Sequence, residues 1–171
     1  MQYLKKTEEQ EATQWMKEAA KIATKALCLR AKCGTVIVKD GTIIGRGYNA
    51  PPLDNKEHRM CLDAYDFSGK PKYDHTCCMH AEWRAILDAT KNNPEKLLGS
   101  RLYFTRVDNE GSIKKSGEPY CTVCSRFALD IGIGEFVLWH EDGICSYPTD
   151  EYNRLSYAYK DPEISKNLEK K

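Results

Sequence analysis

The sequence predicts an α/β fold in which a mixed β-sheet is covered by helices. Apolar side chains near the N-terminus recur at helical spacing, which indicates an amphipathic helix. Two runs rich in β-branched residues follow, joined by Asp-Gly, and this pattern is typical of a β-hairpin. Beyond the hairpin, segments of helical and strand character alternate. The expected order of elements is therefore α-β-β-α-β-α-β-α.

The first expected helix covers about residues 9–30. Its apolar positions lie on one helical face: Ala12, Trp15, Met16, Ala19, Ile22, Ala23, Ala26 and Leu27. The next stretch, TVIVKDGTIIGRGYN, predicts two strands with a tight turn at Asp40-Gly41. Residues 50–76 contain scattered Pro, Gly, Asp and Asn, which favour an irregular segment.

The second half of the chain alternates between helix and strand. A helix is expected over about residues 80–90, because an Asn-Asn-Pro sequence follows and would end it. The stretch SRLYFTRV predicts a strand, CTVCSRFALDIGI a short helix, and EFVLWH another strand. The tail from Asp150 is expected to be helical or irregular.

Length and composition fit a single globular domain, residues 1–171. Hydrophobic residues make up 41% and charged residues 30% of the chain, which is ordinary for a globular protein. The formal net charge is +1, so long nucleic acid is not an expected partner. The N-terminus MQYLKKTEEQ has no apolar core of a signal peptide, and no apolar run reaches membrane-spanning length. We expect a cytoplasmic protein without a membrane partner, in which the eight cysteines are metal ligands or buried thiols rather than disulfides.

Residue types that bind metals open two of the expected helices. Cys121 and Cys124 form a C-x-x-C pair, which alone indicates zinc, a redox pair or two core cysteines. His80, within TCCMHAEWRAI, opens the other helix. Two thiolates and one imidazole give zinc three protein ligands and leave a position for water, as catalytic rather than structural zinc requires. Zinc brings the pKa of bound water to roughly 7.

Glu82 lies two residues after His80, in the first turn of the same expected helix. From there a carboxylate can reach a water at the metal without being a ligand, and can pass a proton from it to a substrate. A glutamate at a helix start is otherwise common on protein surfaces. Together with the three ligands, Glu82 indicates a catalytic general acid and base.

These motifs resemble the signature of the zinc-dependent cytidine and deoxycytidylate deaminase superfamily, H-x-E followed by P-C-x-x-C. H-A-E at residues 80–82 matches the first half. P-Y-C-T-V-C at residues 119–124 matches the second, with one extra tyrosine after the proline. The resemblance covers about residues 28–139, and GTVIVKDGTIIGRGYNAPP is similar to the deoxycytidylate (dCMP) branch. It implies a three-layer α-β-α, cytidine deaminase-like fold with a five-stranded mixed sheet flanked by helices.

The resemblance also implies roles for individual residues. His80, Cys121 and Cys124 would bind a catalytic Zn²⁺. Glu82 would be the general acid and base. Asn49, in GYN, matches the asparagine that contacts the sugar or base of the substrate; the alternative is a turn residue after a strand.

Six cysteines lie outside the catalytic set: Cys28, Cys33, Cys61, Cys77, Cys78 and Cys145. Some deaminases of the dCMP branch resemble this chain in carrying a second, structural zinc. The resemblance implies that Cys28, Cys61 and one or two of His75, Cys77 and Cys78 bind it; the set we favour is Cys28, Cys61, His75 and Cys78. A four-ligand zinc would hold a long loop that has little core of its own. Buried free thiols are the alternative.

The resemblance implies a zinc-dependent hydrolase that deaminates a cytosine-type nucleotide, dCMP first, to dUMP and ammonia. The alternatives are a nucleoside, a free base or a base in nucleic acid as substrate, or a non-catalytic zinc-stabilised binding module, which would not need Glu82. Residues 51–79 form an insert long enough to wall off a phosphate site. The basic candidates for that site are His58, Arg59, Lys70, Lys72, Arg46 and Arg84. Because the family is commonly multimeric, a homo-oligomer is expected.

Overall fold

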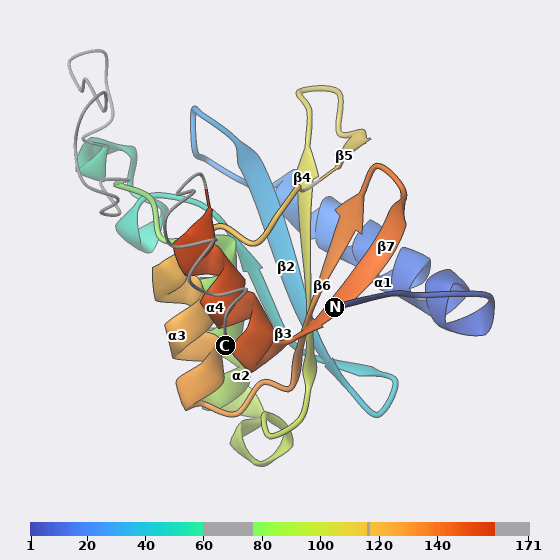
Figure 1. Cartoon of the computed structure of the whole chain (residues 1–171). Coiled ribbons are helices and arrows are strands. Elements are labelled where there is room, and N and C mark those ends of the chain that lie inside the picture. Colours follow the sequence, from blue (N-terminus) through green and yellow to red (C-terminus); the bar gives the residue numbers. More distant parts are fainter. Residues whose placement is uncertain (60–76, 116, 160–171) are drawn as a thin grey trace.

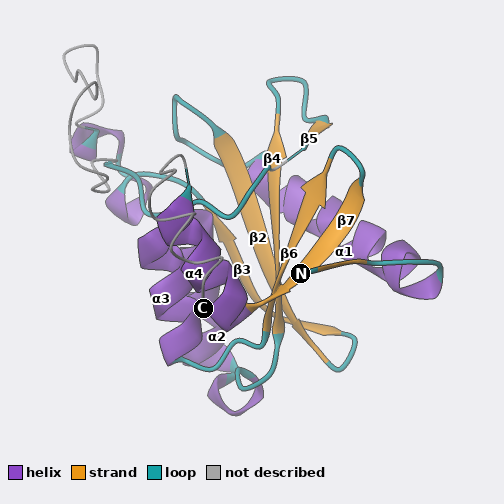
Figure 2. Ribbon diagram, viewed as in Figure 1, coloured by secondary structure: helices purple, strands orange, loops and turns teal. Residues whose placement is uncertain are grey.

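The fold is a mixed β-sheet between two layers of helices, which confirms the expected α-β-α arrangement (Figures 1 and 2). The computed structural model describes residues 1–59, 77–115 and 117–159. The helices there are α1 (Thr7–Ala23), α2 (Ala81–Asn92), α3 (Thr122–Asp130) and α4 (Thr149–Ala158). The strands are β1 (Gln2–Tyr3), β2 (Lys32–Lys39), β3 (Thr42–Tyr48), β4 (Arg101–Val107), β5 (Ile113–Lys114), β6 (Glu135–His140) and β7 (Gly143–Pro148). Short 3₁₀ turns occur at Pro52–Asp54, Lys56–His58 and Pro94–Lys96.

The sheet has the strand order β1-β7-β6-β4-β2-β3, and β5 pairs with β4 beside this path. The strands β4 and β6 pair in parallel, whereas every other pair of the described strands is antiparallel. Helix α1 covers one face of the sheet, and α2, α3 and α4 cover the other (Figure 1). Each face has its own core: Met16 and Val36 belong to the cluster beneath α1, and Ile37 and Ile86 to the cluster beneath α2.

The prediction of five strands was too low, because the described part of the sheet contains seven. The expected order of elements contained four of these seven strands. Of the other three, β1 and β5 are only two residues long. Strand β7 is full-sized but was missed, because its sequence GICSYP has no clear alternation of apolar and polar residues. It pairs with β6 from Glu135–Pro148 to His140–Gly143, so its partner strand fixes its conformation rather than a local pattern.

The first helix ends at Ala23, earlier than the expected end near residue 30. The residues after it bond to the end of β3 instead of continuing the helix. The Leu27 N–H donates to the Asn49 carbonyl at 3.1 Å, and the Asn49 side-chain amide donates to the Ala31 carbonyl at 2.8 Å. These tertiary hydrogen bonds outweigh the helical periodicity at this end of the predicted helix.

The predicted hairpin between β2 and β3 is confirmed. Asp40 and Gly41 at its turn have φ angles of 47° and 68°, as a two-residue turn that matches the twist of the strands requires.

Strand β3 lies unusually close to helix α2. A Cβ added at Gly47 would lie 2.1 Å from the Ala81 carbonyl oxygen and 2.4 Å from the Ala85 nitrogen. A Cβ at Gly45 would lie 2.3 Å from the Ala85 carbonyl oxygen. Glycines on the strand and alanines on the helix therefore set the position of α2, and with it the first turn that carries the H-A-E motif.

Among the described helices, none is long and apolar enough to span a membrane.

Candidate active site

Two helix N-termini meet at one edge of the sheet. Strand β2 runs antiparallel to both β3 and β4, and β4 runs parallel to β6. The C-terminal ends of β3, β4 and β6 therefore share an edge. Helices α2 and α3 cover the same face of the sheet, and their first turns carry the predicted metal ligands.

His80 is the N-cap residue of α2, and its ring faces two cysteines. The Nδ1 of His80 lies 3.1 Å from the Cys124 Sγ and 3.5 Å from the Cys121 Sγ. The Trp83 ring stacks on the imidazole, with centroids 5.0 Å apart and an interplanar angle of 20°. This stacking restricts the imidazole to an orientation in which Nδ1 points at the thiols.

The thiols of Cys121 and Cys124 differ in pKa. Cys121 is the N-cap residue of α3, and its Sγ accepts a hydrogen bond from the Cys124 N–H at 3.3 Å. A hydrogen bond from the Cys124 thiol, helped by His80, lowers the pKa of Cys121 to about 4. Burial raises the pKa of Cys124 well above its ordinary value, and the neighbouring Cys121 adds to this effect. A cation at this position would offset the cost of the second thiolate.

The three side chains fit a zinc ion. Their ligand atoms all lie within 4.8 Å of one another. Zinc–sulfur and zinc–nitrogen bonds of about 2.3 and 2.0 Å at a tetrahedral angle place N and S about 3.5 Å apart. The two N···S distances of 3.1 and 3.5 Å are close to that value. Two thiols and an imidazole are also a donor set that zinc prefers.

Glu82 is buried beside this group, with only 6% of its surface exposed. Burial raises the pKa of its carboxyl, and the negative Cys121 raises it further, whereas a positive His80 lowers it. The carboxyl is also hydrogen-bonded to Cys124. A buried carboxyl with a raised pKa can both take and return a proton at moderate pH.

Asn49 is buried at the end of β3 and is held by the backbone of the segment before β2. Its Oδ1 accepts the Cys33 N–H, and its Nδ2 donates to the Ala31 carbonyl, both at 2.8 Å. One amide hydrogen is left for another acceptor. The structure therefore explains this asparagine by its own contacts, and its contact with a substrate stays a prediction.

Two of the six basic side chains considered for a phosphate site have well-defined partners. Arg84 donates to the Asp54 carboxylate at 2.7 Å and to the Pro51 carbonyl at 2.8 Å. The Tyr48 hydroxyl and then Arg84 hold the pKa of Asp54 below its ordinary value. Arg59 donates to the Leu27 carbonyl at 2.6 Å. The Arg84 contacts hold the loop after β3 against α2, and the Arg59 contact holds it against the segment after α1.

The structure describes two of the remaining four basic candidates. His58 lies with its Nδ1 3.2 Å from the Pro52 carbonyl, and Arg46 is exposed on β3. Lys70 and Lys72 lie outside the described residues, as do the predicted metal ligands Cys61 and His75.

Cys28 and Cys78, the other two members of the predicted second metal set, lie close together. Burial raises the pKa of the Cys78 thiol, and interactions with Cys28 and then Cys77 raise it further. The structure thus brings three of the predicted cysteines into one cluster.

Tyr152, on α4, is a residue near the site that the sequence did not indicate. It is 4% exposed, and its ring stacks on Phe136 with centroids 3.9 Å apart. Burial raises the pKa of its hydroxyl, and the nearby Glu82 and Cys124 contribute. No local motif could have revealed it, because it reaches the site through the packing of α4 on α3 and the sheet.

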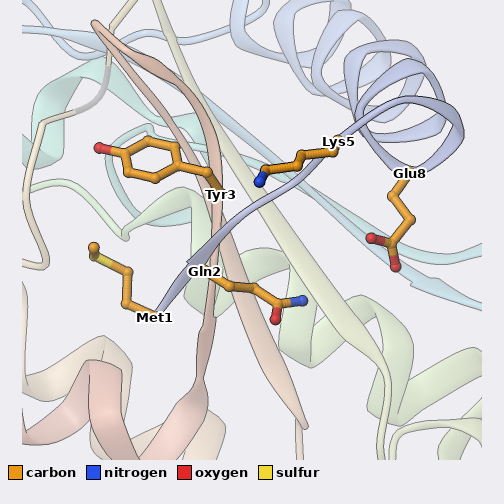
Figure 3. Close-up of a pocket in the computed structure, with 5 residues that line it drawn as sticks. All are labelled: Met1, Gln2, Tyr3, Lys5 and Glu8. Atoms are coloured by element: carbon orange, nitrogen blue, oxygen red, sulfur yellow. The ribbon is translucent and has the colours of Figure 1, made fainter.

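A separate surface hollow of about 530 Å³ lies at the N-terminal segment (Figure 3). It is lined by Met1, Gln2, Tyr3, Lys5 and Glu8. These residues belong to β1 and the start of α1, and none of them belongs to the group around His80. The hollow therefore does not contribute to the candidate metal site.

Comparison with known proteins agrees with the geometry of the site. Residues 9–140 match the model of the cytidine and deoxycytidylate deaminase zinc-binding region. The chain belongs to this family. The match includes both helix N-termini that carry His80, Glu82, Cys121 and Cys124, and it leaves out α4.

Relatives in the deaminase family differ in substrate. A deoxycytidylate deaminase of Saccharomyces cerevisiae is 31% identical over 72% of this chain and 35% of its own length. A deoxycytidylate deaminase of Mycobacterium phage D29 is 31% identical over 70% of this chain and 86% of its own. A tRNA-specific adenosine deaminase of Streptococcus pyogenes is 36% identical over 56% of this chain and 49% of its own. The chain thus spans about a third of the yeast relative.

A solved structure has a similar fold. The dCMP deaminase of cyanophage S-TIM5, crystallised with dCMP and dUMP, superposes with a TM-score of 0.53 at 28% identity. The superposition covers 78% of this chain and 82% of the phage protein. It confirms the cytidine deaminase-like architecture of the sheet and helices.

Proposed function

We propose that this protein hydrolytically deaminates a cytosine-bearing mononucleotide, dCMP first, and releases dUMP and ammonia. Glu82 is the observation that carries this proposal. It is a buried carboxyl beside His80, Cys121 and Cys124, and a purely structural zinc site has no need of it. Family membership supports the reaction class. The phage D29 relative and the cyanophage structure support dCMP as the substrate.

The residues of the site have different roles in the proposed reaction. His80, Cys121 and Cys124 would hold zinc, which when bound supplies the Lewis acidity that brings the pKa of water to about 7. Glu82 would take a proton from the attacking water and deliver it to ring N3, then pass a second to the leaving amine. The C4–O bond forms and the C4–N bond breaks, so one water is consumed and one ammonia is released.

Asn49 is proposed to contact the sugar or the base. The backbone of Ala31 and Cys33 holds its side chain, which leaves one amide hydrogen directed by those bonds. A fixed donor of this kind orients a substrate at little entropic cost.

A second candidate is deamination of a base within nucleic acid. The Streptococcus relative, 36% identical over 98 residues, acts on tRNA according to its name, and it favours this alternative. The net charge of +1 argues against it, because proteins that neutralise many phosphates carry an excess of basic residues.

Ammonia release from a panel of substrates tests the proposal. The panel contains dCMP, deoxycytidine, cytosine, single-stranded DNA and tRNA, each incubated with zinc-loaded protein. We expect dCMP to exceed deoxycytidine and cytosine in kcat/KM by roughly a hundredfold, because an unfilled phosphate site leaves buried charge unpaired. Equal or faster reaction of the nucleoside, the base or the nucleic acids would rule out the nucleotide assignment.

We also propose a second, structural zinc bound by Cys28, Cys61, His75 and Cys78. The proximity of Cys28 and Cys78 supports it, because a metal would relieve the cost of crowding thiols in a buried place. Metal analysis is the test: Cys78→Ala should contain one zinc fewer per chain than wild type, and Cys145→Ala, which changes a buried cysteine of β7, should contain the same number. Equal zinc content in wild type and Cys78→Ala would remove this second site.

We further propose that the chain is a single domain that works in the cytoplasm as a homo-oligomer. Light scattering on the purified protein tests the assembly, and the mass of a monomer at micromolar concentration would refute it.

A further inference from the structure

Arg106 lies near the end of β4. Helices α2 and α3 cover one face of the sheet that contains this strand (Figure 1). Side chains alternate along this strand. The Thr105 hydroxyl donates to the Met16 carbonyl of α1, so Thr105 faces the opposite layer. Phe104 belongs to the core beneath α2, and the Arg106 guanidinium lies 5.9 Å from the Phe104 ring centroid. Arg106 therefore lies on the same side of the sheet as the candidate metal site formed by His80, Cys121 and Cys124.

A single residue, Cys33, connects Arg106 to the site. Cys33 is the register partner of Arg106 on β2. Its thiol is hydrogen-bonded to Arg106 and also interacts electrostatically with the Glu82 carboxylate. The Cys33 N–H also donates to the Asn49 Oδ1 at 2.8 Å. Cys33 thus links Arg106 both to Glu82, the proposed proton carrier, and to Asn49, the proposed substrate-binding residue.

The charge of Arg106 has no opposite partner in the described part of the chain. Its Nε is buried without a hydrogen-bond partner, and it takes part in none of the ion pairs there. The neighbouring Cys33 supplies no negative charge, because burial raises the pKa of its thiol to about 12. An arginine stays protonated at every physiological pH, so this cation is partly buried and uncompensated.

The other charged groups at this edge of the sheet do not compensate the positive charge of Arg106. Lys114 on β5 is the register partner of Arg106 and adds a second positive charge. The carboxylates Glu118 and Asp142 interact with His140 at the end of the neighbouring strand β6. Neither carboxylate forms an ion pair with Arg106 in the described part of the chain, so the charge of Arg106 remains available to a ligand.

We propose that Arg106 binds the 5′-phosphate of the substrate and so makes the enzyme prefer a nucleotide to a nucleoside. This inference rests on the proposed deamination of a cytosine-bearing nucleotide. The planar guanidinium can donate to two phosphate oxygens, and that bond would satisfy a side chain that otherwise costs free energy. Arg84 is less suited, because its guanidinium already donates to the Asp54 carboxylate. Arg59 also has a buried Nε without a partner, but it belongs to the loop after β3, where its guanidinium donates to the Leu27 carbonyl.

The test compares Arg106→Gln and Arg106→Lys with wild type and with a matched control, Arg154→Gln. Arg154 is an exposed arginine on α4 at which the same charge is removed. Two ratios are measured on zinc-loaded protein: kcat/KM for dCMP over deoxycytidine, and affinity for dUMP over deoxyuridine by calorimetry. Circular dichroism and thermal unfolding check that each variant is folded, and Arg106→Lys keeps the charge if the glutamine variant does not fold.

We expect Arg106→Gln to lower both ratios by about a hundredfold. Arg106→Lys should lower them less, because lysine keeps the positive charge but lacks the planar guanidinium that donates to two phosphate oxygens. Arg154→Gln should leave both ratios as in wild type. Unchanged ratios in Arg106→Gln would overturn the inference while the deaminase assignment stands. Absence of deamination by the wild type would overturn the proposed function. In that case the calorimetric affinities alone test the role of Arg106. Equal wild-type affinity for dUMP and deoxyuridine would then overturn its role as well.

Discussion

The Nδ1 of His80 lies 3.1 Å from the Cys124 Sγ, although the two residues are 44 positions apart in the sequence. Each belongs to the first turn of a different helix or its cap. The geometry of the candidate metal site therefore depends on how accurately α2 and α3 are placed on the sheet. The close approach of β3 fixes α2, and α4 supports α3: the Ser125 hydroxyl donates to the Asn153 Oδ1 at 2.8 Å and contacts the Ser156 hydroxyl at 3.1 Å.

Gly47→Ala should destabilise the protein and disturb the site together. The new Cβ would lie 2.1 Å from the Ala81 carbonyl oxygen, and helix backbone cannot move aside as a flexible side chain could. We expect a loss of about 3 kcal/mol in the free energy of unfolding, measured by urea denaturation, and weaker zinc binding.

The matched control for this glycine is Gly41→Ala in the hairpin turn. Nothing lies within 4 Å of a Cβ there, but its φ of 68° makes alanine unfavourable by about 1 kcal/mol. If both variants lose the same stability, the close approach of β3 to α2 does not position the helix.

Cys124→Ala should bind one zinc fewer per chain than wild type and should lose deaminase activity. Cys124 is fully buried and is one of the three proposed ligands, and its loss would leave two protein ligands where zinc sites have three or four. Elemental analysis after dialysis measures the effect. Cys145→Ala is the control, because Cys145 is equally buried but lies outside the metal group. A full zinc content in Cys124→Ala would show that the ligand set is wrong.

His140 should make stability depend on pH in the acid range. Burial lowers its pKa, although Glu118 and Asp142 oppose this, and its Nε2 lies 2.9 Å from the Tyr147 hydroxyl. The folded state therefore favours the neutral imidazole. This contribution is present above the unfolded pKa of about 6.5 and is lost as the pH falls through the lower folded value.

Urea denaturation of wild type and His140→Gln between pH 7.5 and 5 measures this contribution. The wild type should lose more stability over that range than the variant, because glutamine does not titrate. Parallel pH dependences of the two proteins would contradict the lowered pKa of His140.

Local patterns explain the parts of the structure that the sequence predicted. Asp40-Gly41 is a turn signal complete in two residues, and the hairpin is where it was expected. His80 and the C-x-x-C pair are recognisable because zinc restricts both residue type and spacing, and the structure brings all three side chains together.

The features that the sequence did not predict depend on contacts between distant segments. Strand β7 forms because it pairs with β6, and the end of α1 is set by bonds to Asn49. Tyr152 and Arg106 reach the neighbourhood of the site through tertiary packing, and neither belongs to a motif.

Glu82→Gln tests the central claim most directly. Glutamine has the size of glutamate and can still form hydrogen bonds, but it cannot carry a proton, so zinc content and thermal stability should match those of wild type. Ammonia release from dCMP by the zinc-loaded variant should fall by at least about a hundredfold. Glu95→Gln, at an exposed glutamate after α2, should react like wild type. If Glu82→Gln deaminates dCMP at a rate near that of wild type, Glu82 is not the proton carrier and the proposed mechanism is wrong.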